Sequence, residues 1–309
     1  MWSTDVDSNI DMRQAAFDQV RRLGAIYDPL TAAHLLPGFQ FQGQRYPLIN
    51  PQRGIFKPKQ MQHLLSIKTV FPKPGAKVWY DDQRQVHRQI FEGEEVVDYA
   101  FMGQNPDAAD NRWLREAWEK QIPIIYFLGI APGCYQAFLP AFIAGWDRHN
   151  LRAQVSFGEY APANLAPPET SAERRYALRT VKQRLHQASF REAVITAYRG
   201  RCALSGLPEK LLLDAAHIVS DKDELLGQPI ISNGIPLSKL HHAAFDAHLI
   251  GIDADFRLHV SERLLLQNDG PMLEALKHLE GNKLHLPARI KDYPDRNRLA
   301  ARFEQYLAT

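Results

Sequence analysis

Side chains that can bind a metal ion or move a proton are concentrated in one part of this sequence. The run LSKLHHAAFDAHL at 237–249 has a helical pattern, and within it His242 and Asp246 are four residues apart. Residues at this spacing lie on one face of a helix, one turn apart. An imidazole and a carboxylate placed in this way suit Mg²⁺, Mn²⁺, Ni²⁺ or Zn²⁺. The pair therefore predicts a divalent metal site that leaves coordination positions open for water and phosphate.

A second group of polar residues precedes that helix. The run LLLDAAHIV at 211–219 has the composition of a strand and carries Asp214 and His217. A histidine, with an ordinary pKa of about 6.5, can take a proton from water at neutral pH. Asn233 follows in the turn-forming sequence SNG, where its amide can donate and accept hydrogen bonds and so fix a loop. A single histidine in an apolar strand is most often a core residue, but the order of these residues along one short segment favours a catalytic site.

The order His217, Asn233, His242 resembles the signature of HNH nucleases, whose fold is the ββα-metal finger. The agreement extends to the runs AAHIV, NGIPL and LHHAAFD, and it covers roughly residues 188–262. The resemblance implies that His217 is the general base that activates water for attack on a phosphodiester, and that Asn233 holds the loop. It also implies that His242 binds one divalent ion (Mg, Mn, Ni or Co), with Asp246 as the second ligand from the helix.

The residue before the proposed base departs from the family pattern. Many HNH nucleases carry a metal ligand there, but this sequence has Ala216. The nearest acid, Asp214, lies three residues before His217, and on an extended strand these two side chains point to opposite faces. We therefore expect Asp214 to be a metal ligand only if the strand bends, and the sequence leaves its role open.

A second departure concerns structural zinc. Many HNH proteins bind zinc through two CxxC pairs, which correspond here to Cys202 with Ser205 and to Ser238 with His241. One cysteine and one histidine do not make the usual tetrahedral site, so we predict no structural zinc. His241 is then either a phosphate or metal contact or an exposed surface residue. Cys134 is the other cysteine, so a disulfide framework is also excluded.

The elements that must carry these residues fall into two parts. A chain of 309 residues is long enough for about two domains. Residues 171–309 hold all of the motifs above and form the predicted nuclease domain, and the Pro- and Ala-rich run at 158–170 is a predicted linker. Residues 1–157 show short apolar runs between turn residues, with helical patterns over 11–27 and 105–121. The sequence therefore predicts an α+β chain. The expected strands of the first domain are 39–42, 46–49, 64–71, 77–80, 96–101, 122–130 and 135–146.

A basic segment leads into the nuclease motifs. Between residues 171 and 201, eight lysines and arginines face two glutamates, a local net charge of +6, although the whole chain carries only +2. Arg175, Arg179 and Lys182 are spaced so that a helix aligns them on one face. Beside a phosphodiesterase site, we expect these three residues, together with Arg191 and Arg201, to contact DNA phosphates. A solvated helix face is the alternative.

The first domain carries a weaker resemblance. Its runs LINPQRGIFKPKQM (48–61) and PIIYFLGIAPGCYQAFLPAFI (123–143) are similar to domains attached to restriction-type HNH nucleases, which look related to the PUA and SRA-type barrels that recognise modified bases. The resemblance implies a pocket that holds a flipped nucleotide between aromatic rings, with polar groups at its edge. Aromatic residues in strands are more often part of a core. The candidate base-recognition residues are Trp79, Tyr80, Asp81 and Tyr99.

Together these features predict a restriction-type endonuclease for double-stranded DNA, with a role in phage defence and methyl- or hydroxymethylcytosine as the favoured target. An enzyme for unmodified sites, a nuclease gated by a small-molecule signal, and a non-catalytic DNA-binding protein are the alternatives. A double-strand cut by fingers with one site each favours a homodimer. The sequence shows neither a signal peptide nor an apolar run long enough to span a membrane, so we expect a cytoplasmic protein without a membrane partner.

Overall fold

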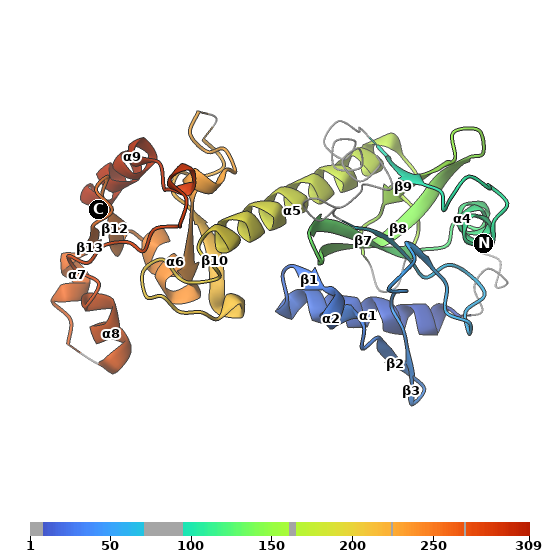
Figure 1. The fold of residues 1–309 in the computed structure, drawn as a ribbon, viewed down its shortest axis with the longest axis horizontal. Coiled ribbons are helices and arrows are strands. Elements are labelled where there is room, and N and C mark those ends of the chain that lie inside the picture. Colours follow the sequence, from blue (N-terminus) through green and yellow to red (C-terminus); the bar gives the residue numbers. More distant parts are fainter. Residues whose placement is uncertain (1–8, 71–94, 161–164, 224, 269) are drawn as a thin grey trace. The chain divides into compact units, whose positions relative to one another are not determined.

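The computed structural model describes residues 9–70, 95–160, 165–223, 225–268 and 270–309 (Figure 1). The chain divides into two compact units, Met1–Ala188 and Ser189–Thr309. The expected strand at 77–80 and the candidate base-recognition residues Trp79, Tyr80 and Asp81 lie outside the described residues.

The first unit is built on a seven-stranded sheet in the order β4-β5-β7-β8-β9-β6, with β1 paired to β8. Strands β5 and β7 are parallel, and the other neighbours are antiparallel. The strands are β1 (Leu30–Thr31), β4 (Ile55–Phe56), β5 (Ser66–Thr69), β6 (Val97–Ala100), β7 (Ile124–Ala131), β8 (Cys134–Asp147) and β9 (Arg152–Phe157).

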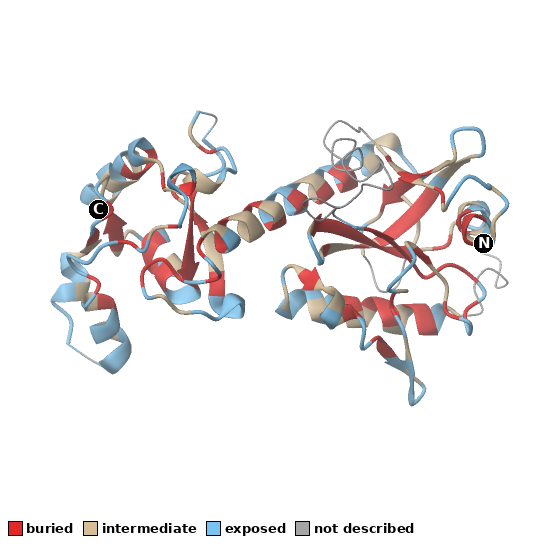
Figure 2. Ribbon diagram, in the orientation of Figure 1, coloured by how far each residue is buried: buried red, intermediate tan, exposed pale blue. Residues whose placement is uncertain are grey.

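Strand β7 shows why this sheet has two cores. Alternate side chains of a strand point to opposite faces. Ile124, Tyr126 and Leu128 accordingly enter one buried cluster, and Ile125 and Phe127 enter another. Figure 2 colours buried residues red, and strand β7 is buried along nearly its whole length. A strand covered on both faces needs apolar residues at every position, which is why the run at 122–130 is continuous rather than alternating.

Helices cover both faces of the sheet. Helix α1 (Ile10–Ile26) packs Phe17 and Val20 into the cluster of Phe127. Helix α4 (Ala109–Glu119) packs Leu114 into the cluster of Tyr126. The helices predicted over 11–27 and 105–121 are therefore confirmed, each with slightly different ends. A short helix, α2 (Ala32–Leu35), and a hairpin of β2 (Phe39–Phe41) and β3 (Gln44–Tyr46) complete the described part of this unit.

One expected strand of this unit is wrong. The run at 46–49 is not a strand, because β3 ends at Tyr46 and the next residue, Pro47, has no N–H to give to a ladder.

The sheet curls so that its two ends approach each other. Three strands separate β5 from β6 in the sheet order, yet the Tyr99 hydroxyl on β6 donates to the Lys68 carbonyl on β5 at 3.4 Å. Gly54 lies beside this hydrogen bond, and a Cβ at residue 54 would be 2.7 Å from the Tyr99 hydroxyl oxygen. The predicted α+β fold class is confirmed, since this unit is a curled sheet covered by helices.

Helix α5 (Ser171–Ala197) contributes to both units. Leu178, Val181 and Leu185 are buried in the core of the first unit, whereas Ile195 is buried in the core of the second. The boundary after Ala188 therefore differs from the domain start expected at residue 171. The first turns of this helix thus carry an apolar face that is buried in the core of the first unit. They also carry basic residues of the segment 171–201.

The described part of the expected linker packs against the first unit. Residues 158–160 and 165–170 form no helix or strand. Tyr160 and Leu165 nevertheless contact the cluster of Phe17, and the Tyr160 hydroxyl donates to Asp18 at 2.9 Å. This stretch is thus a covering segment rather than a free spacer.

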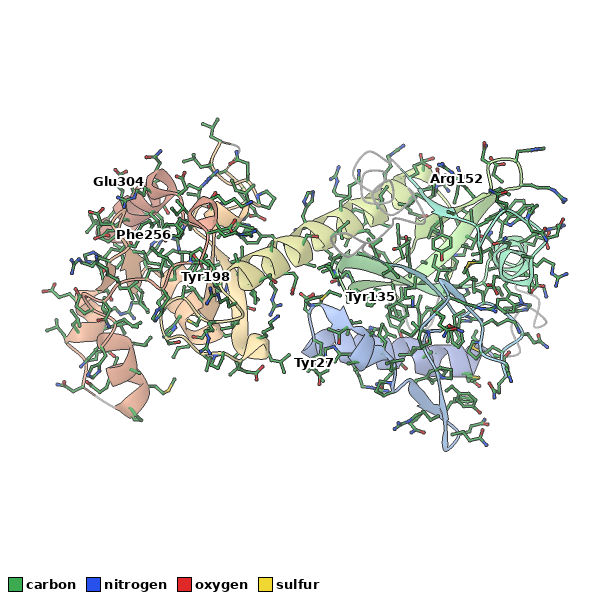
Figure 3. The ribbon with its side chains drawn as sticks, in the orientation of Figure 1. Tyr27, Tyr135, Arg152, Tyr198, Phe256 and Glu304 are labelled. Carbon is green, nitrogen blue, oxygen red and sulfur yellow. The ribbon has the colours of Figure 1, made fainter. Side chains whose placement is uncertain are left out.

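The second unit holds a hairpin, a helix that follows it and a second hairpin. Strands β10 (Leu213–His217) and β11 (Gly234–Ser238) pair antiparallel, followed by α6 (Lys239–Asp246). Tyr198 and Phe256, labelled in Figure 3, belong to the core of this unit. The remaining elements are η1 (Lys210–Leu212), η2 (Ile231–Asn233), β12 (Ile250–Ile252), β13 (Leu258–Val260), α7 (Glu262–Leu265), α8 (Gly270–Lys277), η3 (Ile290–Asp292) and α9 (Arg296–Leu307).

Helix α6 is shorter than the run that predicted it. Ser238 is its N-cap, and the Ser238 hydroxyl accepts a hydrogen bond from the His241 N–H at 3.2 Å. The helix ends at Asp246, and His248 has a left-handed backbone with a φ of 54°. The predicted order of two strands and a helix is therefore present. No helix in the described part of the chain has the length and apolar character needed to cross a membrane.

Candidate active site

His217 lies at the last position of β10, opposite Gly234 in the hairpin. Its imidazole is stacked on the Phe190 ring of α5, with the ring centroids 4.1 Å apart and the planes 14° apart. Within the described ranges, the buried Nε2 of His217 has no hydrogen-bond partner. Burial lowers the pKa of His217 below its ordinary value, and the nearby His242 acts in the same direction, while Asp221 and Asp246 oppose the shift. The shift favours the neutral ring, which is the form that can accept a proton.

Asn233 fixes the loop that connects the two strands. Its side chain is fully buried, its Oδ1 accepts from the Val219 N–H at 3.0 Å, and its Nδ2 donates to the Val219 carbonyl at 3.0 Å. The same Nδ2 donates to the Gln228 carbonyl at 3.1 Å. These contacts hold the chain two residues after His217.

His242 lies between two carboxylates. Its Nε2 is 3.3 Å from Asp246 Oδ2, one turn along α6, and its Nδ1 is 3.6 Å from Asp214 Oδ2 on β10. Strand β10 is paired without a register shift from Leu213 to His217. Asp214 therefore lies beside His242 without any shift in the strand register, because α6 packs against β10.

The three side chains offer a donor set that suits a hard or borderline divalent ion. In the part of the chain that the structure describes, no cluster of three or more His, Cys, Asp or Glu side chains is arranged to hold a metal ion. The reason is visible at His242, where the two ring nitrogens face different carboxylates. The residue types fit a metal ion, and a side-chain rotation would be needed for all three to share one.

The four positions that carry zinc ligands in many HNH proteins form a hydrogen-bonded cluster here. Cys202 Sγ lies 3.3 Å from His241 Nδ1 and accepts from the Ser238 N–H at 3.3 Å. Burial raises the pKa of the Cys202 thiol, but hydrogen bonds from His241 and Ser205 outweigh it and bring the pKa to about 6. His241 is buried, so the expectation of an exposed residue is wrong, and the engaged ring does not fit the expected phosphate contact.

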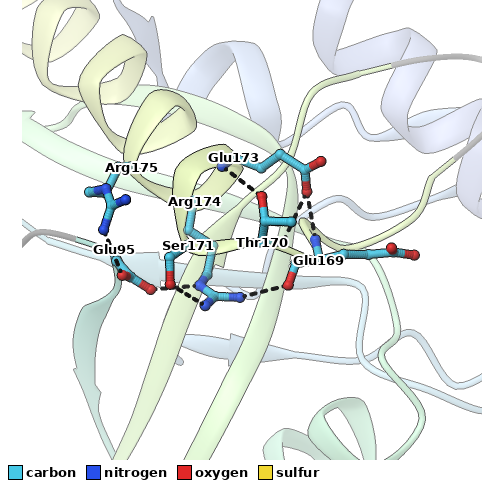
Figure 4. Close-up of polar contacts among 7 residues, drawn as sticks. All are labelled: Glu95, Glu169, Thr170, Ser171, Glu173, Arg174 and Arg175. Atoms are coloured by element: carbon cyan, nitrogen blue, oxygen red, sulfur yellow. Dashed lines mark hydrogen bonds and ion pairs between the residues drawn. The ribbon is translucent and has the colours of Figure 1, made fainter.

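The basic residues expected to contact DNA are partly engaged within the protein. Arg175 lies 3.4 Å from Glu95, which also pairs with Arg174 at 2.8 Å (Figure 4). Hydrogen bonds from Arg174 and Ser171, opposed by some burial, lower the pKa of Glu95. This pairing neutralises part of the positive charge that the segment has in the sequence.

The other predicted DNA contacts differ in their surroundings. Arg191 donates to the carbonyls of Leu213 at 2.7 Å and Lys210 at 3.2 Å, and Arg201 donates to the Gly206 carbonyl at 3.1 Å. Of the remaining two residues, Arg179 is exposed and Lys182 is half-buried. Arg191 therefore has a structural role in joining α5 to β10.

Tyr99 is the described member of the predicted base-recognition set. Its side chain is 5% exposed, and its ring packs edge-on to Tyr126 with the centroids 6.0 Å apart. It also lines a cavity of about 220 Å³ between β4, β5 and β6, together with Arg53, Lys68 and Phe101. Tyr99 is thus a core residue at the wall of a cavity rather than a freely accessible stacking ring.

Two arginines that sequence reasoning missed come from α9. Arg298 donates to the Leu226 carbonyl at 2.8 Å, in the loop that Asn233 also holds. Arg302 donates to the Phe245 carbonyl at 2.9 Å and lies 3.7 Å from Asp246. In a sequence, basic residues four apart on an amphipathic helix indicate only a solvated face, so nothing distinguished these two from ordinary surface charge.

Comparisons with known proteins agree with this geometry for the second unit. Residues 202–253 match the family model of HNH endonucleases (HNH_2), and this range contains Asp214, His217, Asn233, His242 and Asp246. No curated protein matches the chain.

Among solved structures, the chain is similar to one described as "Modification dependent TagI restriction endonuclease", with 13% identity and a TM-score of 0.31. The similarity covers 82% of this chain and 85% of that one, and a TM-score this low does not establish a common fold. The match to the family model makes residues 202–253 an HNH endonuclease domain, and the protein is a nuclease.

Proposed function

We propose that the protein is a metal-dependent endonuclease of the restriction type, which hydrolyses phosphodiester bonds in double-stranded DNA. The observation that carries the proposal is the arrangement of His217, Asn233 and His242 on one hairpin and the helix that follows it. A neutral histidine at a strand end, a fixed loop and a cluster of metal-binding groups are the parts that this reaction needs.

The chain's own residues have separate tasks in this reaction. His217 takes the proton from water as the water oxygen attacks the phosphorus atom. Asn233 keeps the end of β10 in place through its bonds to Val219. His242 and Asp246, with Asp214, would hold one divalent ion such as Mg²⁺, Mn²⁺, Ni²⁺ or Co²⁺. When bound, that ion stabilises the charge that develops on the phosphate and on the leaving 3′ oxygen.

The first unit is the proposed selector of the target. Its curled sheet suits a PUA- or SRA-like domain, and the cavity beside Tyr99 is a candidate pocket for a flipped base. Lys68 is buried at this cavity, and its amine donates to the carbonyls of Asn50 at 3.0 Å and Pro51 at 3.2 Å. Methyl- or hydroxymethylcytosine in DNA is the favoured target, and phage DNA in the cytoplasm is its source.

Two copies of the chain are expected to act together, since each nuclease unit has one candidate site and a double-strand cut needs two. Arg179 is exposed on α5 and remains a proposed contact to DNA phosphates.

The decisive experiment digests plain, methylated and hydroxymethylated duplexes with the wild type and the His217→Ala variant, each with Mg²⁺, Mn²⁺, Ni²⁺ and Co²⁺. We expect the wild type to cut modified DNA, and the variant to lose about 10²–10⁴-fold in rate while still binding DNA. Undiminished cleavage by the variant would remove His217 from the mechanism. Equal cleavage of all three duplexes would instead reject the modification dependence alone.

A further inference from the structure

An aromatic side chain outside the matched HNH segment lies against the proposed base. Phe190 is on α5, twelve positions before residue 202, and is 4% exposed. Its ring is stacked on His217, with 4.1 Å between the centroids and 14° between the planes. Both residues belong to the second unit. A nearly parallel contact at this distance fixes the plane of the imidazole as well as its position.

The Phe190 ring is itself held against the hairpin. Gly234 lies opposite His217, and a Cβ at residue 234 would be 2.7 Å from Phe190 Cζ and 2.4 Å from Val194 Cγ2. Real Cβ atoms do not approach other heavy atoms so closely. The close packing therefore depends on glycine at this position, and the backbone of residue 234 blocks movement of the ring toward β11.

The neighbouring residue fixes the helix relative to the same strand. Arg191 donates to the Leu213 carbonyl at 2.7 Å, at the first residue of β10. Phe190 contacts His217, the last residue of β10. Adjacent residues of α5 thus reach both ends of one strand, so the helix cannot slide along β10 without breaking one of these contacts.

The stack is the contact that can orient the His217 ring. Among the described residues, no hydrogen bond is made by either ring nitrogen of His217, and Nε2 is buried without a partner. Catalytic histidines are commonly oriented by a hydrogen bond from the second ring nitrogen to a carboxylate or a carbonyl. At His217 the described contact that can perform this task is the stack.

We propose that Phe190 is a positioning residue, which sets the plane of the His217 imidazole so that one nitrogen faces the attacking water. The proposal depends on the proposed role of His217 as general base. It extends the functional part of the nuclease unit to α5, before the segment that the family model covers.

The test uses two variants of the full-length protein. Phe190→Leu keeps an apolar side chain but removes the ring. Val194→Ala is the matched control, because Val194 also packs on Gly234 from α5 but makes no ring contact with His217. Steady-state cleavage with Mn²⁺ gives kcat and KM, thermal melting gives Tm, and NMR of histidine-labelled protein reports the ring-current shift of the His217 protons.

We expect Phe190→Leu to lower kcat by about 10- to 100-fold with KM unchanged, because a small misplacement of a catalytic group has an effect of this size. The His217 proton shifts should move toward their unstacked values. Val194→Ala should lower Tm while kcat and the His217 proton shifts are retained. Equal kcat values for Phe190→Leu and Val194→Ala would overturn the proposal.

The His217→Ala variant separates the two hypotheses. If it retains activity, His217 is not the base and the proposed function fails, whatever Phe190 does. If it loses activity while Phe190→Leu keeps full kcat, His217 is the base but the stack does not position it.

Discussion

Asn233 and Val219 hydrogen-bond to each other twice, once in each direction, and both distances are 3.0 Å. When such a buried amide is removed, the backbone groups that it paired with are left without a hydrogen-bond partner. We predict that Asn233→Ala lowers the free energy of unfolding by about 2–3 kcal/mol, because it leaves backbone groups of Val219 without partners. Cleavage should fall as well, since the loop begins directly after His217.

Urea denaturation and single-turnover cleavage test this prediction. Ser232→Ala is the control, because its backbone carbonyl, which accepts from the Asp295 N–H at 2.9 Å, remains in place. Equal stability of the two variants would show that the Asn233 bonds add nothing to the loop.

The pH dependence of cleavage should report His217. Burial lowers its pKa, so the ring stays unprotonated to a lower pH than a free histidine. A general base acts in its unprotonated form, so kcat/KM should rise with pH through a pKa below about 6.5 and be level at pH 7. Because the lowered pKa disfavours the charged ring in the folded state, stability should also fall as pH drops below about 6.5. A rate profile that rises only above pH 7 would contradict this assignment.

Metal binding should depend on the residues around His242. We predict that His242→Ala and Asp246→Ala each weaken Mn²⁺ binding by at least about tenfold, since either one removes a proposed ligand. Isothermal titration calorimetry measures this without DNA. Asp255→Asn is the control, because Asp255 is an exposed acid of the same unit that pairs with Arg296 at 2.9 Å. Retained affinity in both test variants would place the ion elsewhere.

The cluster around Cys202 should stabilise the nuclease unit without zinc. The folded pKa of about 6 lies below the ordinary 9.0, so the thiolate is favoured by folding. Its contribution is therefore present above about pH 9 and is lost as pH falls through 6. We predict that the difference in Tm between the wild type and Cys202→Ala grows from pH 6 to pH 9, and that EDTA leaves the wild type folded. Unfolding by EDTA would instead indicate a structural metal.

Truncation should show where the first unit ends. A fragment of residues 1–188 keeps Leu178, Val181 and Leu185 in its core, whereas a fragment of residues 1–157 loses them. Burial of three such side chains contributes about 4–8 kcal/mol, so we expect a cooperative melt from the longer fragment only. The longer fragment should also retain selectivity for modified DNA in gel-shift assays. Equal melting curves would return the boundary to residues 158–170.

The sequence predicted those parts of the molecule whose signal is local. The helix of His242 and Asp246 and the continuous apolar run of β7 follow from spacing and composition, and both are present. The position of Asp214 beside His242 could not be predicted, because alternation along a strand indicates which face a side chain occupies but not which helix covers that face. His241 was misjudged because its contact, Cys202, lies 39 residues away in the sequence. Arg302 and Phe190 are ordinary residues in sequence, and their positions arise only from tertiary packing.

The contact distances at Gly234 have a consequence for how this nuclease can change over generations. Substitution at residue 234 by a residue with a Cβ would bring that atom within 2.7 Å of both Phe190 and Val194, so these side chains would have to shift. The position next to Asn233 therefore favours glycine, although it contributes no functional group. We expect that a single change at residue 234 can disable the enzyme through the ring that lies on His217, with every catalytic side chain still encoded.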